Sequence, residues 1–67
     1  MKRDKRLAAI LTLLDETGLV EVDTLADHFD VSPETIRRDL STLSEQALLR
    51  KVHGGAVKFQ PGTTSQE

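Results

Sequence analysis

The sequence predicts a mainly α-helical fold with a small β-hairpin, an α+β domain built on three helices. Segments near the start and in the middle of the chain repeat apolar residues at the i, i+3 or i+4, i+7 spacing of helices that face a core. Near the end, two short strand-like runs flank a Gly-Gly pair, which is typical of a β-hairpin. The 67 residues include no cysteine, tryptophan or tyrosine, so one small aliphatic core without disulfides is expected.

The first helix is expected from Lys2 to about Glu16. Its apolar stripe consists of Leu7, Ile10, Leu11 and Leu14. Gly18 follows at the place where a residue with positive φ commonly ends a helix. Basic residues fill the first turn, which is the unfavourable end for the helix dipole. Two interpretations stay open: the turn binds an external anion, or it is a frayed cationic terminus.

A helix-turn-helix is expected next in the chain. Residues 19–22 alternate apolar and polar side chains and could form one short strand. A second helix should run from residue 22 or 23 to Phe29, with either Glu21 or Asp23 as its cap. Only Asp30 and Val31 separate it from the following helix. Asp tolerates the left-handed conformation better than most residues, which suits a turn this tight.

The third helix has a well-marked start. Ser32 is a good N-cap, Pro33 suits the first helical position, and Glu34 complements the helix dipole. The helix should end near Gln46. Its buried stripe is expected to be Ile36, Leu40 and Leu43.

The outward face of this helix has a distinctive set of side chains. At about 100° per residue, Arg38, Glu34 and Ser41 lie opposite the buried stripe, with Arg37 and Thr35 on its flanks. Short side chains and arginines at the exposed start of a helix fit the major groove of DNA. A solvated face is the plainer alternative.

Asp39 is expected to be structural. It lies near the buried stripe of the third helix, and a carboxylate that faced DNA would be repelled by the phosphates. We therefore expect Asp39 to pair with a basic residue of another element, either Arg6 or Arg50.

The charge pattern is segregated along the chain. The net charge is −2, with an isoelectric point near 5.6, which argues against a simple basic nucleic-acid binder. However, no Lys or Arg occurs between Leu7 and Ile36, so basic residues gather before and after that stretch. A molecule with one basic side can still hold a phosphate backbone.

The predicted hairpin is centred on Gly54 and Gly55, which should supply the positive φ of a tight turn. Leu49 or Val52, together with Val57 or Phe59, would cover the helices. The side chains expected to project as a basic ribbon are Arg50, Lys51 and Lys58.

Three helices, a tight turn and a basic hairpin describe a winged helix-turn-helix. The run Val-Ser-Pro-Glu-Thr-Ile-Arg-Arg-Asp-Leu at residues 31–40 and the run Val-His-Gly-Gly-Ala at residues 52–56 resemble the N-terminal DNA-binding domain of the DeoR family of bacterial transcriptional regulators. The resemblance covers about residues 3–58. Asp30 and Ala47 stand where this family often has glycine, and Ala is reluctant to adopt positive φ.

The resemblance implies a sequence-specific repressor of sugar or related metabolism that acts in the cytoplasm. Residues 1–59 would be the winged helix-turn-helix domain, which binds a double-stranded DNA operator. Residues 60–67, rich in Pro, Gly, Thr and Ser, would lead as a linker to a C-terminal domain. That further domain would bind a phosphorylated sugar-type effector and assemble a homo-oligomer, while the present chain could be a monomer. No cofactor, metal or membrane partner is expected.

The expected DNA contacts fall into two groups. On the third helix they are Ser32, Thr35, Arg37, Arg38 and Ser41. On the wing and the N-terminus they are Lys51, His53, Gly54, Gly55, Lys5 and Arg6. The sequence does not decide which arginine reads a base and which contacts a phosphate.

Other function classes fit the sequence less well. The residue types needed for catalysis are sparse, because there are two separated histidines, no cysteine and no paired carboxylates on one face. No apolar run approaches the ~18 residues of a membrane span. The rival hypothesis is a winged-helix protein-interaction module without DNA binding, which the acidic net charge favours. Single-stranded RNA binding would need an exposed aromatic platform.

Overall fold

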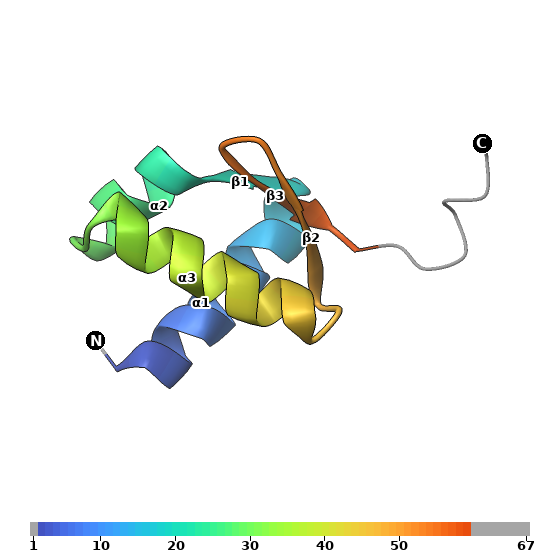
Figure 1. The fold of residues 1–67 in the computed structure, drawn as a ribbon, viewed down its shortest axis with the longest axis horizontal. Helices are drawn as coiled ribbons and strands as arrows, with labels where there is room; N and C mark the ends of the chain where they lie inside the picture. Colours follow the sequence, from blue (N-terminus) through green and yellow to red (C-terminus); the bar gives the residue numbers. More distant parts are fainter. Residues whose placement is uncertain (1, 60–67) are drawn as a thin grey trace.

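The computed structural model describes residues 2–59 of the chain, and its elements confirm the predicted fold class (Figure 1). In chain order they are α1 (Arg3–Thr17), β1 (Leu19–Glu21), α2 (Val22–Phe29), α3 (Pro33–Glu45), β2 (Leu49–Val52) and β3 (Gly55–Lys58). The linker predicted at residues 60–67 lies outside the described part of the chain. No helix in residues 2–59 is both long and apolar enough to span a membrane.

Helix α1 ends where the sequence predicts. Gly18 has φ +81°, and its N–H donates to the carbonyl oxygen of Leu14 at 2.7 Å. Nothing lies within 4 Å of the position that a Cβ on Gly18 would occupy. Glycine is therefore needed at position 18 because the backbone is left-handed there, and not because a side chain would lack space.

The turn between α2 and α3 also follows the prediction. Asp30 adopts φ +57°, ψ +47°, and the next amide, of Val31, donates to the carbonyl oxygen of Ala26 at 3.0 Å. Val31 is half-buried and packs against the core. Glu21 occupies the N-cap position of α2 without a capping hydrogen bond from its side chain, so the expected side-chain cap is not formed there.

The predicted hairpin is part of a larger sheet. β2 and β3 form the hairpin, and β1 pairs antiparallel with β3, giving the strand order β1-β3-β2. The short strand near residue 20 is thus confirmed, and its partner is the wing. We use "wing" for the hairpin of residues 49–58.

The two wing glycines have different roles. Gly54 has φ +79°, as predicted for a tight turn, whereas Gly55 is buried and does not have positive φ. A Cβ on Gly55 would lie 2.0 Å from the carbonyl oxygen of Val20 in β1. The prediction that both glycines supply positive φ is wrong for Gly55, which is needed because β1 approaches it so closely.

The core joins all three helices to the sheet. Its buried apolar side chains are Ile10, Leu14, Val20, Val22, Leu25, Ala26, Ile36, Leu40, Leu43, Leu49 and Ala56. The predicted stripe of α3 is fully confirmed. On the wing, Leu49 covers the helices as expected, while Val52 and Phe59 are each 40 % exposed.

Candidate nucleic-acid interface

A buried ion pair fixes α3 on α1. The Arg6 guanidinium donates through Nε to Oδ2 of Asp39 and through Nη2 to Oδ1, the latter at 3.1 Å. The side chains are only 10 % and 2 % exposed. The structural role predicted for Asp39 is confirmed, and its main partner is Arg6. Arg50, the other candidate, is exposed.

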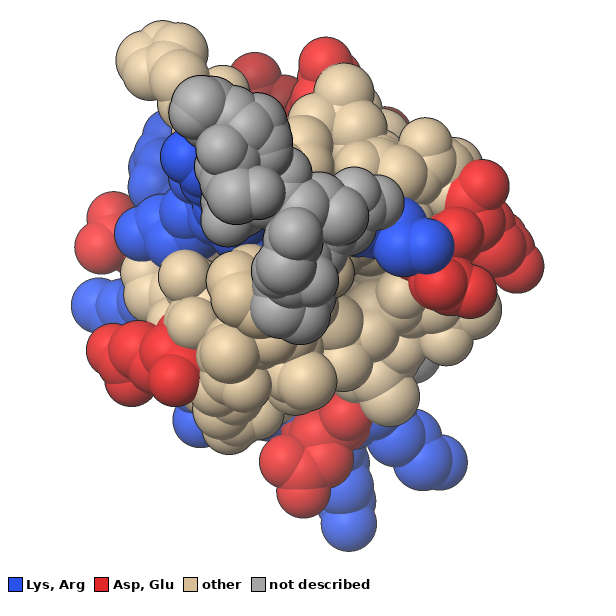
Figure 2. Space-filling view, turned by 90° about the vertical axis from the view of Figure 1, so that its right-hand side faces the viewer, with Lys and Arg blue, Asp and Glu red and all other residues tan. Residues whose placement is uncertain are grey.

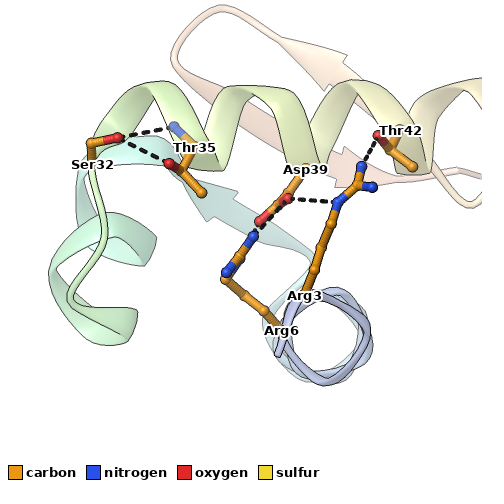
Figure 3. Close-up of polar contacts among 6 residues, drawn as sticks. All are labelled: Arg3, Arg6, Ser32, Thr35, Asp39 and Thr42. Carbon is orange, nitrogen blue, oxygen red and sulfur yellow. Dashed lines mark hydrogen bonds and ion pairs between the residues drawn. The ribbon is translucent and has the colours of Figure 1, made fainter. Parts of the chain in front are cut away.

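Arg3 extends this connection by one turn. Its Nη2 donates to Thr42 Oγ1 at 2.7 Å, and its Nε lies 3.6 Å from Asp39 Oδ1. Figure 3 shows both arginines reaching from α1 towards the same side of α3. The positive charge of the first turn of α1 is therefore partly neutralised by the carboxylate of Asp39. The sequence did not lead us to expect this contact for Arg3. The matching i, i+3 spacing of Arg3–Arg6 and Asp39–Thr42 is the signal that could have revealed it.

The pair also affects the pKa of Arg6. The hydrogen bond to Asp39 raises the pKa of Arg6 above its ordinary value, although burial acts in the opposite direction. Arg6 was expected to touch the DNA backbone beside Lys5. The structure corrects this expectation, because its guanidinium is bound to Asp39 and is almost fully removed from the surface. Lys5 is exposed.

The start of α3 is capped as predicted. Ser32 Oγ accepts from the backbone N–H of Thr35 at 3.2 Å, and the two hydroxyl groups lie 3.0 Å apart (Figure 3). Ser32 is exposed and Thr35 is half-buried. This end of the helix therefore presents two hydroxyl groups beside the first-turn amides, which is the polar surface that a phosphate contact would use.

The wing is tied to α3 on its other side. Lys51 Nζ of β2 donates to Ser41 Oγ at 2.8 Å. A depression next to this contact is lined by residues of α3 and the wing and by Val22 of α2; Arg37, Leu40 and Lys51 are among them. The structure thus brings together predicted contact residues that are far apart in the sequence.

The wing tip carries two of the predicted contact residues. His53 and Gly54 are exposed at the turn between β2 and β3. Gly55 is buried beside β1, with which its strand pairs, so we remove it from the candidate contacts, along with Arg6.

The outward side of α3 holds two opposite charges, Glu34 and Arg38. Arg38 Nη2 lies 3.7 Å from Glu34 Oε2, one turn earlier on the same helix, and the side chains are 78 % and 71 % exposed. We call these two residues the outer arc. Arg37, on the flank towards the wing, is also exposed.

Basic and acidic side chains are interspersed on one face of the molecule (Figure 2). On the face shown in Figure 2, Lys and Arg side chains alternate with Asp and Glu side chains around the rim. Lys58 of the wing pairs with Asp15 of α1 at 3.1 Å, which joins the basic and acidic parts of the sequence. This face is therefore not the basic side that the sequence predicts.

Comparisons with known proteins agree with this geometry. The family model of the DeoR-like helix-turn-helix domain matches residues 6–61. The chain is 48% identical over 57 residues to the glycerol-3-phosphate regulon repressor of Escherichia coli, covering 85% of this chain and 23% of that protein.

Of two further relatives, one is named a repressor and the other an activator. The chain is 48% identical over 52 residues to the transcriptional repressor AccR of Agrobacterium fabrum, covering 78% of this chain and 20% of that protein. It is 50% identical over 48 residues to the L-fucose operon activator of Haemophilus influenzae, covering 72% and 19%. The chain therefore spans less than a quarter of the length of these relatives. No solved structure gives a significant match.

Proposed function

The chain belongs to the DeoR-like helix-turn-helix domain family of DNA-binding transcriptional regulators, and on that premise we propose that α3 enters the major groove and reads an operator. The wing and the start of α1 would contact the phosphate backbone on either side. Because a recognition helix contacts base edges mainly through its N-terminal residues, the residues proposed to meet the bases are Glu34, Thr35, Arg37 and Arg38.

One observation supports this proposal above the others: α3 is held from both sides and leaves its outward side free. Arg6 fixes it to α1 through Asp39, and Lys51 of the wing contacts it through Ser41. The two elements that hold α3 also carry exposed cations, Lys5 on α1 and Lys51 on the wing. Cations on both sides of a groove-sized helix can neutralise phosphates of both strands.

For the whole protein we propose an operator-binding repressor of sugar or related metabolism, active in the cytoplasm. Two of the three relatives described above are named repressors and one is named an activator, so repression is the favoured sense. A part of the protein outside residues 2–59 would bind a phosphorylated effector, in keeping with the glycerol-3-phosphate in the name of one relative. A homo-oligomer would read two half-sites, since paired recognition helices bind about one DNA turn apart.

A salt titration of binding to duplex DNA tests the proposal. Affinity should fall steeply with salt, because each neutralised phosphate contributes about −0.9 to the slope of log K against log salt. Arg37→Ala or Arg38→Ala should flatten that slope by about one unit if the arginine contacts a phosphate. A folded chain that shows no DNA binding at low salt would contradict the proposal, and salt-insensitive binding to a protein would favour the interaction-module alternative.

A further inference from the structure

The outer arc of α3 contains a carboxylate, and this is unexpected on a surface that faces DNA. Glu34 lies on the side of the helix opposite its buried stripe, between the flank that contacts α1 through Thr42 and the flank that contacts the wing through Ser41. Its side chain is 71 % exposed. If α3 lies in the major groove, Glu34 faces the bases.

The ion pair with Arg38 does not by itself explain this placement. A pair separated by 3.7 Å with both partners largely in solvent contributes little to stability. The phosphates on both sides of the groove would repel the carboxylate. In the free domain Glu34 complements the dipole at the start of α3. In a complex with DNA, a hydrogen-bond donor in the groove would offset the repulsion by the phosphates.

The major groove has few donors. Guanine presents the acceptors N7 and O6, and thymine presents O4, whereas cytosine presents its N4 amino group and adenine its N6 amino group beside the acceptor N7. An ionised carboxylate only accepts hydrogen bonds. It therefore rejects guanine and thymine, and it fits cytosine better than adenine because N7 of adenine would repel it.

We propose that Glu34 is a specificity-determining residue that accepts a hydrogen bond from the N4 amino group of a cytosine. This inference rests on the proposed DNA binding and names the chemistry of one base. The charged ends of Glu34 and Arg38 are 3.7 Å apart, close to the ~3.4 Å spacing of successive base pairs. Arg38 would then lie within reach of a neighbouring base pair, where guanine offers two acceptors to a guanidinium.

The chain contains a matched control for this carboxylate. Glu45 is also exposed and lies eleven residues further along α3, which at about 100° per residue puts it on the same side of the helix. It sits at the C-terminal end, away from the residues that meet base edges in this class of motif. Glu34→Gln and Glu45→Gln remove the same charge from the two ends of one helix.

The test is selection of binding sequences from a randomised duplex library by the 67-residue chain and its variants. Glu34→Gln should change the preferred base at one position from cytosine to adenine, because glutamine pairs with N6 and N7 of adenine. Glu34→Ala should lose the preference at that position by roughly 5–100-fold. Glu45→Gln should select the wild-type motif, although both Gln variants should bind non-specific DNA more tightly.

Three results would overturn the inference. The first is an unchanged motif with Glu34→Gln and Glu34→Ala. The second is a change confined to the position that Arg38→Ala also abolishes, since Glu34 would then act only by orienting Arg38. The third is a wild-type chain that stays folded and selects no motif, which would also contradict the proposed function. If the wild-type chain selects a motif, the proposed DNA binding holds, and a negative result with the variants then concerns only the role of Glu34.

Discussion

Arg6 of α1 and Asp39 of α3 are joined by two hydrogen bonds within a buried ion pair. Asp39 directly follows Arg37 and Arg38 in the sequence, yet it is buried and points towards α1 (Figure 3), whereas the two arginines are exposed. Because Asp39 is fixed, the rotation of α3 about its own axis is fixed as well. The direction in which the two exposed arginines point is therefore set by a contact on the buried side of the helix.

Asp39→Ala should strongly destabilise the domain. The change leaves the Arg6 guanidinium buried without its carboxylate, and breaking one side of a buried pair costs about 3–5 kcal/mol. For a domain of this size each kcal/mol shifts the melting temperature by about 4–8 °C, so a fall of more than about 10 °C is expected in thermal melting followed by circular dichroism. Asp27→Ala, an exposed carboxylate on α2, is the control and should change little. An unaltered melting temperature for Asp39→Ala would contradict the structural role.

A paired replacement should recover most of the loss. In the double variant Arg6→Met, Asp39→Leu no buried charge remains unpaired, and apolar replacement of a whole buried pair is often neutral or stabilising. The double variant should therefore melt above Asp39→Ala, and the two changes should be clearly non-additive, as expected for residues in contact. If the fall in melting temperature of the double variant equals the sum of the falls measured for Arg6→Met alone and Asp39→Leu alone, the two side chains are not energetically coupled.

Ala47→Gly should stabilise the domain. Ala47 has φ +60°, a left-handed conformation that costs an L-residue roughly 1–2 kcal/mol. Glycine removes this strain, but its greater freedom in the unfolded chain costs about 0.4–1 kcal/mol of stability. The free energy of unfolding measured in urea should therefore rise by about 0.5–1 kcal/mol. Ala8→Gly, at an exposed position inside α1, should instead lose about 1 kcal/mol. A loss of stability for both variants would exclude strain at Ala47.

Gly55→Asn should disrupt the sheet while Gly54→Asn is tolerated. A side chain on Gly55 would meet the carbonyl oxygen of Val20 and separate β1 from β3, whereas nothing lies within 4 Å of the corresponding position on Gly54. Overpacking costs about 1–3 kcal/mol or more, and Asn adopts positive φ more readily than most residues. Urea unfolding should therefore give a clearly higher free energy of unfolding for Gly54→Asn than for Gly55→Asn. The reverse order would refute the close approach of β1 to Gly55.

Much of the α3 geometry was predictable because local chemistry determines it. Ser32 and Pro33 mark the start of the helix, and Asp30 permits the left-handed turn before it. Each of these features depends on residues within a few positions of one another. For the same reason the buried stripe of α3 could be read from its periodicity.

The features that sequence reasoning missed depend on distant contacts. β1 pairs with β3 across more than thirty residues, so neither its partner nor the reason for Gly55 is visible in a local pattern. A helical wheel gave the direction of Asp39 but not its distance from other elements, which left Arg6 and Arg50 as equal candidates. Arg3 was missed because the i, i+3 spacing that it shares with Arg6 becomes informative only once α1 is known to pack against Asp39 and Thr42 of α3.

Lys51→Met should reduce the salt dependence of DNA binding, whereas Ser41→Ala should not. In the free domain Lys51 donates to a neutral hydroxyl group, 2.8 Å away, and a phosphate oxygen is the stronger acceptor because its hydrogen bond is charge-assisted. Loss of one lysine–phosphate contact should make the negative slope of log K against log salt shallower by about 0.9. Lys58→Met is the matched control, since Lys58 belongs to the same hairpin but pairs with Asp15 of α1. If Lys51→Met leaves the slope unchanged, or Lys58→Met lowers it equally, the wing does not contact the backbone through Lys51.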